Sequence, residues 1–214
     1  MKRKTLDILF SLGGVAIAGL LVIAGLVLAA NASFANDYVT SQLSQQKISF
    51  KSLDTMTAEE KAQACLVTYA GQPLTTGKQA ECYANNFIGL HLEGIAGGKT
   101  YAELGDVQSQ LRTQVTQAQK DNAANLADLQ KQLADTTASR ETVFKGETLR
   151  GLLLTSYGFS EFGTKAAQAS TVAYLAAGVL LLLAMAGFAH ALKTPPTAGF
   201  AVPEAADRKV KVNA

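Results

Sequence analysis

Two long runs without a charged residue constrain this chain more than any other feature of its sequence. Residues 8–36 and 166–192 contain no Asp, Glu, Lys or Arg, so the uncharged runs are 29 and 27 residues long. About 20 apolar residues suffice for a helix to cross the hydrocarbon core of a bilayer. The sequence therefore predicts transmembrane helices over residues 8–32 and 166–192, and it excludes an ordinary soluble enzyme.

A secretory signal peptide is the alternative interpretation of the first run. The basic start Met1-Lys-Arg-Lys and the small residues of Ala30-Asn-Ala32 fit a signal peptide with its cleavage site. The apolar region of a signal peptide, however, is about 7–15 residues long, and this run is about twice that length. We therefore expect a retained membrane anchor.

The charges outside the two runs predict the topology. The tails, residues 1–7 and 193–214, together carry 7 Lys+Arg and 3 Asp+Glu, whereas residues 33–165 carry the remaining 12 Lys+Arg and 14 Asp+Glu. Lys and Arg close to a span favour the cytoplasmic side. We expect both tails to be cytoplasmic and residues 33–165 to be extracytoplasmic, in a plasma membrane.

Small residues recur along both predicted spans at intervals of seven. Such residues let membrane helices approach closely, so the stripes predict packing of the two spans against each other or against a partner's helices. The alternative is that Gly and Ala are simply common in membrane helices. The predicted packing residues are Ser11, Gly14, Ala18, Gly25, Ser170, Ala173, Ala177 and Ala184.

The segment between the spans has the start signals of helices. A Ser or Thr followed three residues later by Glu or Gln forms a capping box, and glycines mark helix ends. No alternating strand pattern competes, so we expect an all-α segment with helices near 58–70, near 77–93 and from 101 onward. The capping boxes are Thr57 with Glu60, Thr76 with Gln79 and Thr100 with Glu103.

The two cysteines lie symmetrically about a predicted helical hairpin. Cys65 precedes Gly71 by six residues, and Cys82 follows Thr76 by six residues. Folding the two helices together brings the sulfurs to the same level, and an oxidising compartment permits a disulfide. The alternatives are two free thiols or a metal site, although no His or further Cys stands at ligand spacing.

Beyond residue 101 an apolar stripe predicts one long amphipathic helix to about residue 144. The stripe runs from Val107 to Leu133 with spacings of three and four residues, and Asn122 is its one polar member. A one-sided helix has to bury its stripe against other parts of the chain or against another copy. Homodimerisation through residues 107–133 is therefore a second possibility.

An apolar cluster precedes the second span. Its aromatic rings suit a membrane–water interface or the docking of a partner, and the alternative is the core of the helical segment. Glycines at 146, 151, 158 and 163 predict that no single helix runs through this region. The candidate interfacial residues are Leu149, Leu152, Leu153, Tyr157, Phe159 and Phe162.

No catalytic, cofactor-binding or metal-binding set emerges from the sequence. The run Gly94-Ile-Ala-Gly-Gly-Lys-Thr100 misses the phosphate-loop pattern by one position, since residue 93 is Glu93. His91 and Glu93 stand two apart on a predicted helix and point about 200° apart. We expect a non-enzymatic protein without a cofactor, and an acidic outer segment that binds no nucleic acid.

Three segments carry a resemblance to a known group of proteins. The chain resembles an uncharacterised actinobacterial family of two-span membrane proteins, some of whose members are labelled ring-opening dioxygenases. The resemblance implies a bacterial envelope setting and covers both spans and most of the segment between them. No His and carboxylate cluster for iron supports the dioxygenase label. The segments are Gln72-Pro-Leu-Thr-Thr-Gly-Lys-Gln-Ala80, Gly97-Gly-Lys-Thr-Tyr-Ala102 and Lys145-Gly-Glu-Thr-Leu-Arg-Gly-Leu-Leu-Leu154.

Taken together, these features favour an accessory or scaffold subunit of a larger membrane complex. An extracytoplasmic sensor is a rival class, although a 22-residue tail at 193–214 has no room for an output domain. A module that binds membrane lipid through residues 149–162 is another. A cavity between the outer helices would favour lipid binding, whereas a flat apolar face would favour the scaffold.

Overall fold

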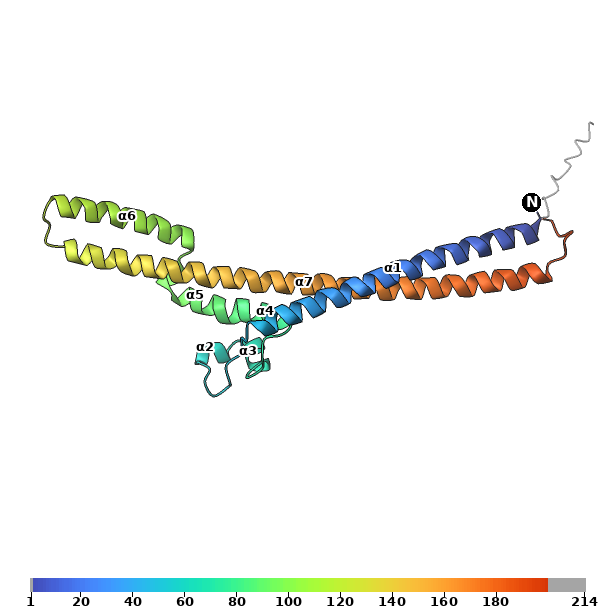
Figure 1. Cartoon of the computed structure of the whole chain (residues 1–214), viewed down its shortest axis with the longest axis horizontal. Helices are drawn as coiled ribbons and strands as arrows, with labels where there is room; N and C mark the ends of the chain where they lie inside the picture. Colours follow the sequence, from blue (N-terminus) through green and yellow to red (C-terminus); the bar gives the residue numbers. More distant parts are fainter. Residues whose placement is uncertain (1, 200–214) are drawn as a thin grey trace, which may run out of the picture. The chain divides into compact units, whose positions relative to one another are not determined.

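The computed structural model describes residues 2–199, and this part of the chain is built of helices joined by turns and loops, with two isolated β-bridges and no strand (Figure 1). The all-α prediction is therefore confirmed for these residues. The basic residues at 208, 209 and 211 of the predicted tail lie outside them. The helices are α1 (Arg3–Gln45), α2 (Ala58–Lys61), α3 (Ala64–Thr68), α4 (Gly77–Cys82), the π-helix η1 (Tyr83–Gly89), α5 (Leu90–Gly94), the 3₁₀ turn η2 (Ala96–Gly98), α6 (Tyr101–Lys120) and α7 (Leu126–Lys193).

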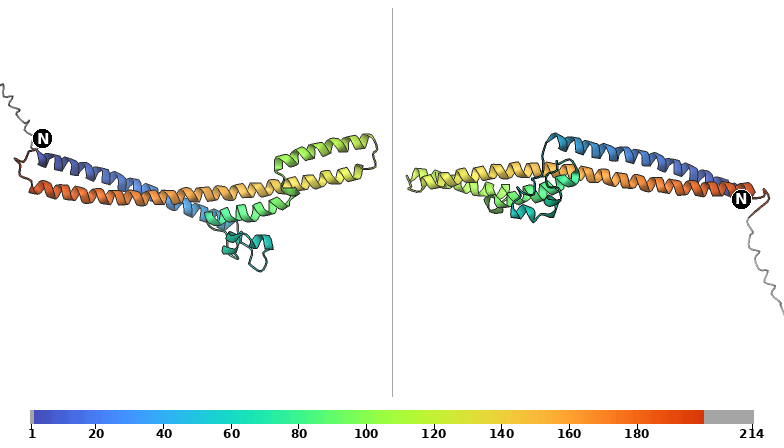
Figure 2. Two further views of the ribbon diagram at one scale, coloured as in Figure 1. Left: turned by 180° about the vertical axis from the view of Figure 1, so that it is seen from behind. Right: turned by 90° about the horizontal axis from the view of Figure 1, so that it is seen from below.

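The chain divides into two compact units, and α1 and α7 contribute to both. Unit 1 comprises residues 1–30 and 166–214, and unit 2 comprises residues 31–165. In unit 1 the two helices lie side by side in both views of Figure 2. Both α1 and α7 are long and apolar enough to cross a membrane.

Small side chains hold the two helices of unit 1 together. The Ser170 hydroxyl donates a hydrogen bond to the Gly25 carbonyl over 2.8 Å. A Cβ on Gly14 would lie 3.5 Å from the Cβ of Ala184, and Ala18 is fully buried. Contacts of 14 with 184 and of 25 with 170 show that the helices are antiparallel. A seven-residue repeat of small residues permits this close packing because it keeps one stripe facing the partner.

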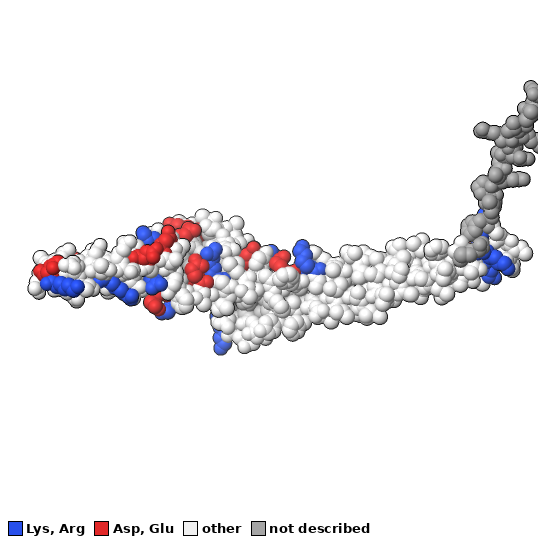
Figure 3. Space-filling view, turned by 90° about the horizontal axis from the view of Figure 1, so that it is seen from above, with Lys and Arg blue, Asp and Glu red and all other residues white. Residues whose placement is uncertain are grey.

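The outer surface of unit 1 is apolar. Leu20 and Leu175 are each 67% exposed, and Phe10 is 73% exposed. In Figure 3 the long stretch without red or blue atoms belongs to this unit, whereas acidic and basic side chains cover much of unit 2. Large apolar side chains that surround a helix pair are typical of helices in contact with lipid.

A disulfide closes the region between α3 and α4 in unit 2. Cys65 and Cys82 are bonded, and their Cα atoms lie 6.0 Å apart. The predicted disulfide is therefore confirmed. The bond stands beside the core of unit 2, where Leu66 and Leu74 are almost fully buried.

All three capping boxes form, but the helices after them are shorter or less regular than predicted. In each box the hydroxyl accepts from the third residue, and that residue's side chain accepts from the cap N–H. The predicted helix at 58–70 is interrupted at 62–63, and the one at 77–93 passes through a π-helix. Capping boxes fix where a helix begins, but packing decides how far it runs.

The prediction of one helix from 101 to 144 is wrong, because the chain reverses at residues 121–125. Asn122 adopts a positive φ of 48°. The Ala123 N–H donates to the Ala118 carbonyl over 2.9 Å, and the Asn122 N–H donates to Gln119 over 3.4 Å. These are the two bonds of a Schellman motif, with Asn in the left-handed position. Asn122 therefore ends a helix instead of interrupting a seam.

The apolar stripe of α6 is buried within the chain, and the left view of Figure 2 shows α6 lying along the first part of α7. Gln108 donates to Thr137 over 2.7 Å and accepts from Arg140 over 2.9 Å, and Leu111 and Val115 are each 8% exposed. The continuous helix on which the dimer hypothesis rested is absent from residues 101–144. Homodimerisation through 107–133 stays a prediction without that support.

The prediction that glycines interrupt the region before the second span is also wrong. One α-helix runs from Leu126 to Lys193. Close packing explains the glycine at 163, since a Cβ there would lie 2.9 Å from the Ala35 Cβ and 3.3 Å from the Ala32 carbonyl oxygen. Nothing lies within 4 Å of a Cβ built on Gly151. A helix tolerates such a glycine at a loss of about 1 kcal/mol relative to Ala.

These two glycines form a matched pair for a test. Gly151→Ala should raise the free energy of unfolding by up to about 1 kcal/mol, because alanine favours the helix. Gly163→Ala should lower it by about 1–2 kcal/mol, because the new methyl group forces α1 and α7 apart. Thermal unfolding of the full chain in detergent, followed by circular dichroism, measures both. Equal effects at the two sites would contradict the packing role of Gly163.

The disulfide should stabilise the oxidised protein. Replacing Cys65 and Cys82 with Ser should lower the free energy of unfolding by about 3 kcal/mol, as a loop of this length implies. With reductant present, the parent and the double variant should unfold at the same temperature. A double variant that melts with the parent in the absence of reductant would show that the bond adds no stability.

Candidate functional site

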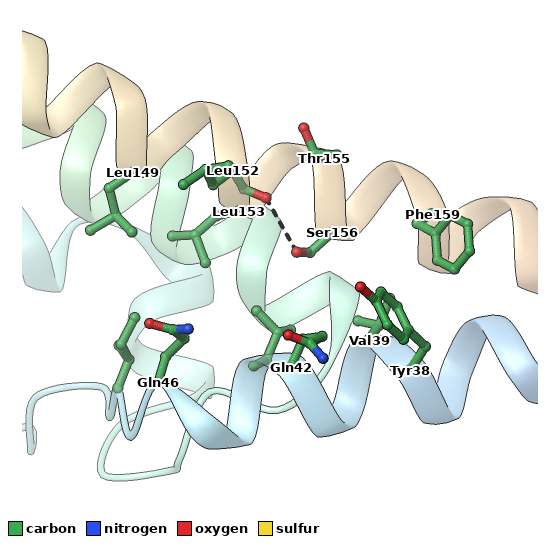
Figure 4. Close-up of a pocket in the computed structure, with 12 residues that line it drawn as sticks. Tyr38, Val39, Gln42, Gln46, Leu149, Leu152, Leu153, Thr155, Ser156 and Phe159 are labelled. Atoms are coloured by element: carbon green, nitrogen blue, oxygen red, sulfur yellow. Dashed lines mark hydrogen bonds between the residues drawn. The ribbon is translucent and has the colours of Figure 1, made fainter.

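An apolar groove in unit 2 lies between the last part of α1 and the middle of α7 (Figure 4). Its volume is about 390 Å³, which falls within the usual range for small-molecule sites. None of the lining residues is Asp, Glu, Lys or Arg. The lining consists of Tyr38, Val39, Gln42, Leu43, Gln46, Ile48, Leu149, Leu152, Leu153, Thr155, Ser156 and Phe159.

One wall comes from the last part of α1 and the turn after it, and the other from α7. Tyr38 and Gln42 are spaced by four on α1, Gln46 follows the end of that helix, and Leu149, Leu152 and Ser156 are spaced by three and four on α7. Figure 4 shows Leu149 and Leu153 of α7 directed toward Gln42 and Gln46 across the groove, whereas Thr155 points away from it. The amides and hydroxyls lie among the apolar side chains, so the walls are uncharged but not uniformly apolar.

Three aromatic rings gather at one end of the groove. The ring of Phe159 lies 5.9 Å from that of Tyr38 and 6.4 Å from that of Phe34, in edge-to-face arrangements. Phe34 and Tyr38 stack on each other at 5.9 Å. In sequence, Tyr38 follows the first predicted span by six residues and Phe159 precedes the second by seven. The aromatic end is therefore the part of the groove nearest to both spans in chain order.

The six predicted interfacial residues do not all lie in one place in the structure. Leu149, Leu152 and Phe159 line the groove and are partly exposed. Leu153 also lines it but belongs to the core of unit 2, where it is 3% exposed. Phe162 does not line the groove and is 77% exposed.

Tyr157 belongs to a polar cluster instead. Its hydroxyl accepts a hydrogen bond from the Lys78 ammonium over 3.1 Å, and Lys78 also pairs with Glu161 at 3.3 Å and Glu81 at 3.4 Å. The hydrogen bond to Tyr157, followed by that to Glu161, raises the pKa of Lys78 above its ordinary value. This cluster ties α4 to α7.

The predicted packing residues of the spans come together in unit 1. The structure places them on the facing sides of α1 and α7, so the stripes that were also candidates for a partner's helices face each other. A Cβ on Gly25 would collide with the Tyr174 ring. The buried members are Ser11, Ala18, Gly25, Ser170, Ala173, Ala177 and Ala184, and Gly14 is partly exposed.

A buried carboxylate that the sequence assigned only to a capping box joins three segments of unit 2. Glu60 is 1% exposed and accepts hydrogen bonds from the Lys51 ammonium over 2.7 Å and from the Thr57 N–H over 2.9 Å. The His91 Nε2 atom lies 3.2 Å from the same carboxylate. Burial by itself raises the pKa of Glu60, but these partners outweigh it, so the pKa lies below its ordinary value.

His91 therefore faces Glu60 and not Glu93, its neighbour in sequence. Its Nδ1 atom lies 2.6 Å from the carbonyl oxygen of Phe87. Both ring nitrogens thus lie close to oxygen atoms, one of the Glu60 carboxylate and one of the Phe87 carbonyl. Lys51 precedes Glu60 by nine residues and His91 follows it by 31, and no helix of regular spacing connects the three, so the pairing left no local signal.

Acid should destabilise unit 2 through Glu60. Because its pKa is lower in the folded than in the unfolded chain, its contribution is present above the unfolded pKa of about 4.3 and is lost as the pH falls through the folded value. Glu60→Gln should lower the free energy of unfolding at neutral pH by about 1–3 kcal/mol. The variant should also lose less stability than the parent between about pH 6 and pH 3.

Chemical unfolding of the full chain at several pH values measures this dependence. Glu141→Gln is the matched control, because Glu141 is exposed and pairs with Lys145 only at 3.9 Å. The same pH dependence in the parent and in Glu60→Gln would argue against the assignment.

No protein-family model, curated protein or solved structure matches the chain. The resemblance to the two-span actinobacterial family therefore stays a prediction, and the groove is interpreted from its own geometry.

Proposed function

We propose that the chain is a two-span membrane protein that binds lipid, with an acyl chain held in the groove of unit 2. Residues 33–165 lie outside the cytoplasm of a bacterial plasma membrane in this proposal, and both tails lie inside. The observation that carries it is the uncharged, concave groove between α1 and α7. A cavity between the outer helices is the feature that distinguishes lipid binding from a flat scaffold face.

The lining favours an acyl chain over a polar ligand. Burying a charged group in the groove would be costly because no charged partner lines it. An apolar chain gains about 25 cal/mol for each Å² removed from water. The aromatic end of the groove suits the region where a lipid passes from its chain to its headgroup.

A scaffold or accessory subunit of a larger membrane complex is the second candidate. It is favoured by apolar side chains that remain exposed around the groove, such as Phe34 at 62% and Phe162 at 77%. A partner helix that covered these rings would bury a continuous apolar surface. The small-residue stripes contribute less to this candidate, because α1 and α7 use them on each other.

Purification of the tagged full chain in mild detergent, with mass spectrometry of bound lipids and proteins, separates the two functions. Lipid binding predicts a stoichiometric acyl lipid that survives washing. Ser156→Trp should reduce the bound lipid several-fold because the indole fills the groove. Thr164→Trp, on the same helix but outside the lining, should retain it.

Two results would contradict the lipid proposal. One is a stoichiometric membrane complex without bound acyl lipid, which would favour the accessory subunit. The other is an equal amount of lipid on both tryptophan variants, which would show that the lipid belongs to the detergent-exposed surface.

A further inference from the structure

A second cavity of unit 2 has a different chemical character. Its volume is about 580 Å³, and its lining comes from η1, α5, the loop before α6, the start of α6 and residues 143–150 of α7. Leu92 and Val143 are its buried apolar members. Unlike the groove, it is also lined by charged side chains, although most of its exposed lining surface is apolar. Its polar and charged lining residues are Asn85, Glu93, Lys99, Thr100, Tyr101, Glu147 and Arg150.

Arg150 is an incompletely satisfied cation in this lining. Its Nη1 atom donates to the two oxygens of Glu147 over 3.3 and 3.4 Å, and its Nη2 atom donates to Asn85 over 3.3 Å. Charge-assisted bonds to carboxylates are normally about 2.7–2.9 Å long. The Nε atom is buried and has no hydrogen-bond partner among residues 2–199. A buried donor without a partner is unfavourable, and no exposed surface of Nε remains for a ligand to reach. The Arg150 side chain is 36% exposed, however, and the long bonds of its Nη atoms leave the guanidinium able to bind a closer anion.

The wall that supplies Asn85 is itself unusual. Residues Tyr83–Gly89 form a π-helix, and both Asn85 and Gly89 lie in the lining. π-helical turns are rare and are frequently found at functional sites. This observation is independent of the state of Arg150 and points to the same cavity.

The opposite wall adds further capacity for an anion. The capping box of α6 uses the N–H groups of Thr100 and Glu103. Tyr101 and Ala102 open the helix and belong to the lining, and the positive end of the helix dipole favours negative charge there. The Glu103 carboxylate already accepts from the Thr100 N–H at this end. Lys99 lies beside them in the lining.

Glu93 gives the cavity a complementary negative group. No Lys, Arg or His in the described part of the chain lies within 4.0 Å of its carboxylate, whereas Glu147 is engaged by Arg150. The lining thus contains an unsatisfied guanidinium and an ammonium together with one carboxylate that has no ion-pair partner. A molecule with one negative and one positive group matches this arrangement.

We propose that this cavity binds a small zwitterion of the amino-acid type. The ligand carboxylate lies against Arg150, Lys99 and the first amides of α6, and the ligand ammonium lies against Glu93. A free amino acid and the end of a peptide share this chemistry. The site is separate from the acyl-chain groove, and its assignment does not depend on lipid binding.

Binding of four probes to the full chain in detergent tests the assignment: L-alanine, L-alanyl-L-alanine, acetate and methylammonium. Ligand-observed NMR measures each affinity. At least one of L-alanine and the dipeptide should bind saturably. Its binding should be at least about tenfold tighter than that of acetate or methylammonium, which corresponds to about 1.4 kcal/mol. The tighter of the two zwitterions identifies the source as a free amino acid or a peptide.

Variants locate the site. Glu93→Gln should weaken the binding of the zwitterion about tenfold and leave that of acetate unchanged, because acetate has no ammonium group. Arg150→Gln should weaken both. Glu141→Gln, outside the lining, should change neither. Circular dichroism shows whether each variant is folded, and the exposed position of Glu93 keeps the test available if Arg150→Gln does not fold.

Three outcomes would overturn the proposal. They are the absence of saturable binding for both zwitterions, acetate binding as tight as that of the tighter zwitterion, and zwitterion binding that Glu93→Gln leaves unchanged.

Discussion

Close contact between α1 and α7 is the interaction on which both units depend. In unit 1 it is made by small residues such as Ala18 and Ser170, and in unit 2 by Ala32, Ala35 and Gly163. Dispersion between backbones is strong only when the helices approach closely, so a single added methyl group has a large effect. The groove lies between residues 38–48, from the last part of α1 and the turn after it, and residues 149–159 of α7.

Local chemistry made part of this fold predictable. The capping boxes, the disulfide and the two apolar helices all follow from residues a few positions apart or from composition. The turn at Asn122 also had a local signal, since Asn in the left-handed position after a helix is common. The apolar stripe that continues past Asn122 concealed the turn, because α6 and α7 both bury apolar residues in the same hairpin.

The remaining features depend on neighbours that are distant in sequence. Whether a helical position such as Gly163 needs glycine depends on what packs opposite it. No local sequence pattern distinguishes Gly163 from Gly151, where a Cβ would meet nothing within 4 Å. The groove joins residues more than 100 positions apart, so only its α7 wall was predicted. Likewise, Glu60 lies beside His91, 31 residues later in the chain, and Arg150 bonds to Asn85 of the π-helix, 65 residues earlier.

The pairing of α1 with α7 also has a consequence for synthesis. The hydrogen bond between Ser170 and Gly25 spans 145 positions, whereas the disulfide and the α6–α7 hairpin link residues that leave the ribosome close together. Local structures of this kind form early, and contacts between distant segments form late. In the proposed two-span arrangement, the first helix therefore enters the bilayer with its small-residue face unpaired. It remains so until translation of the last helix is complete.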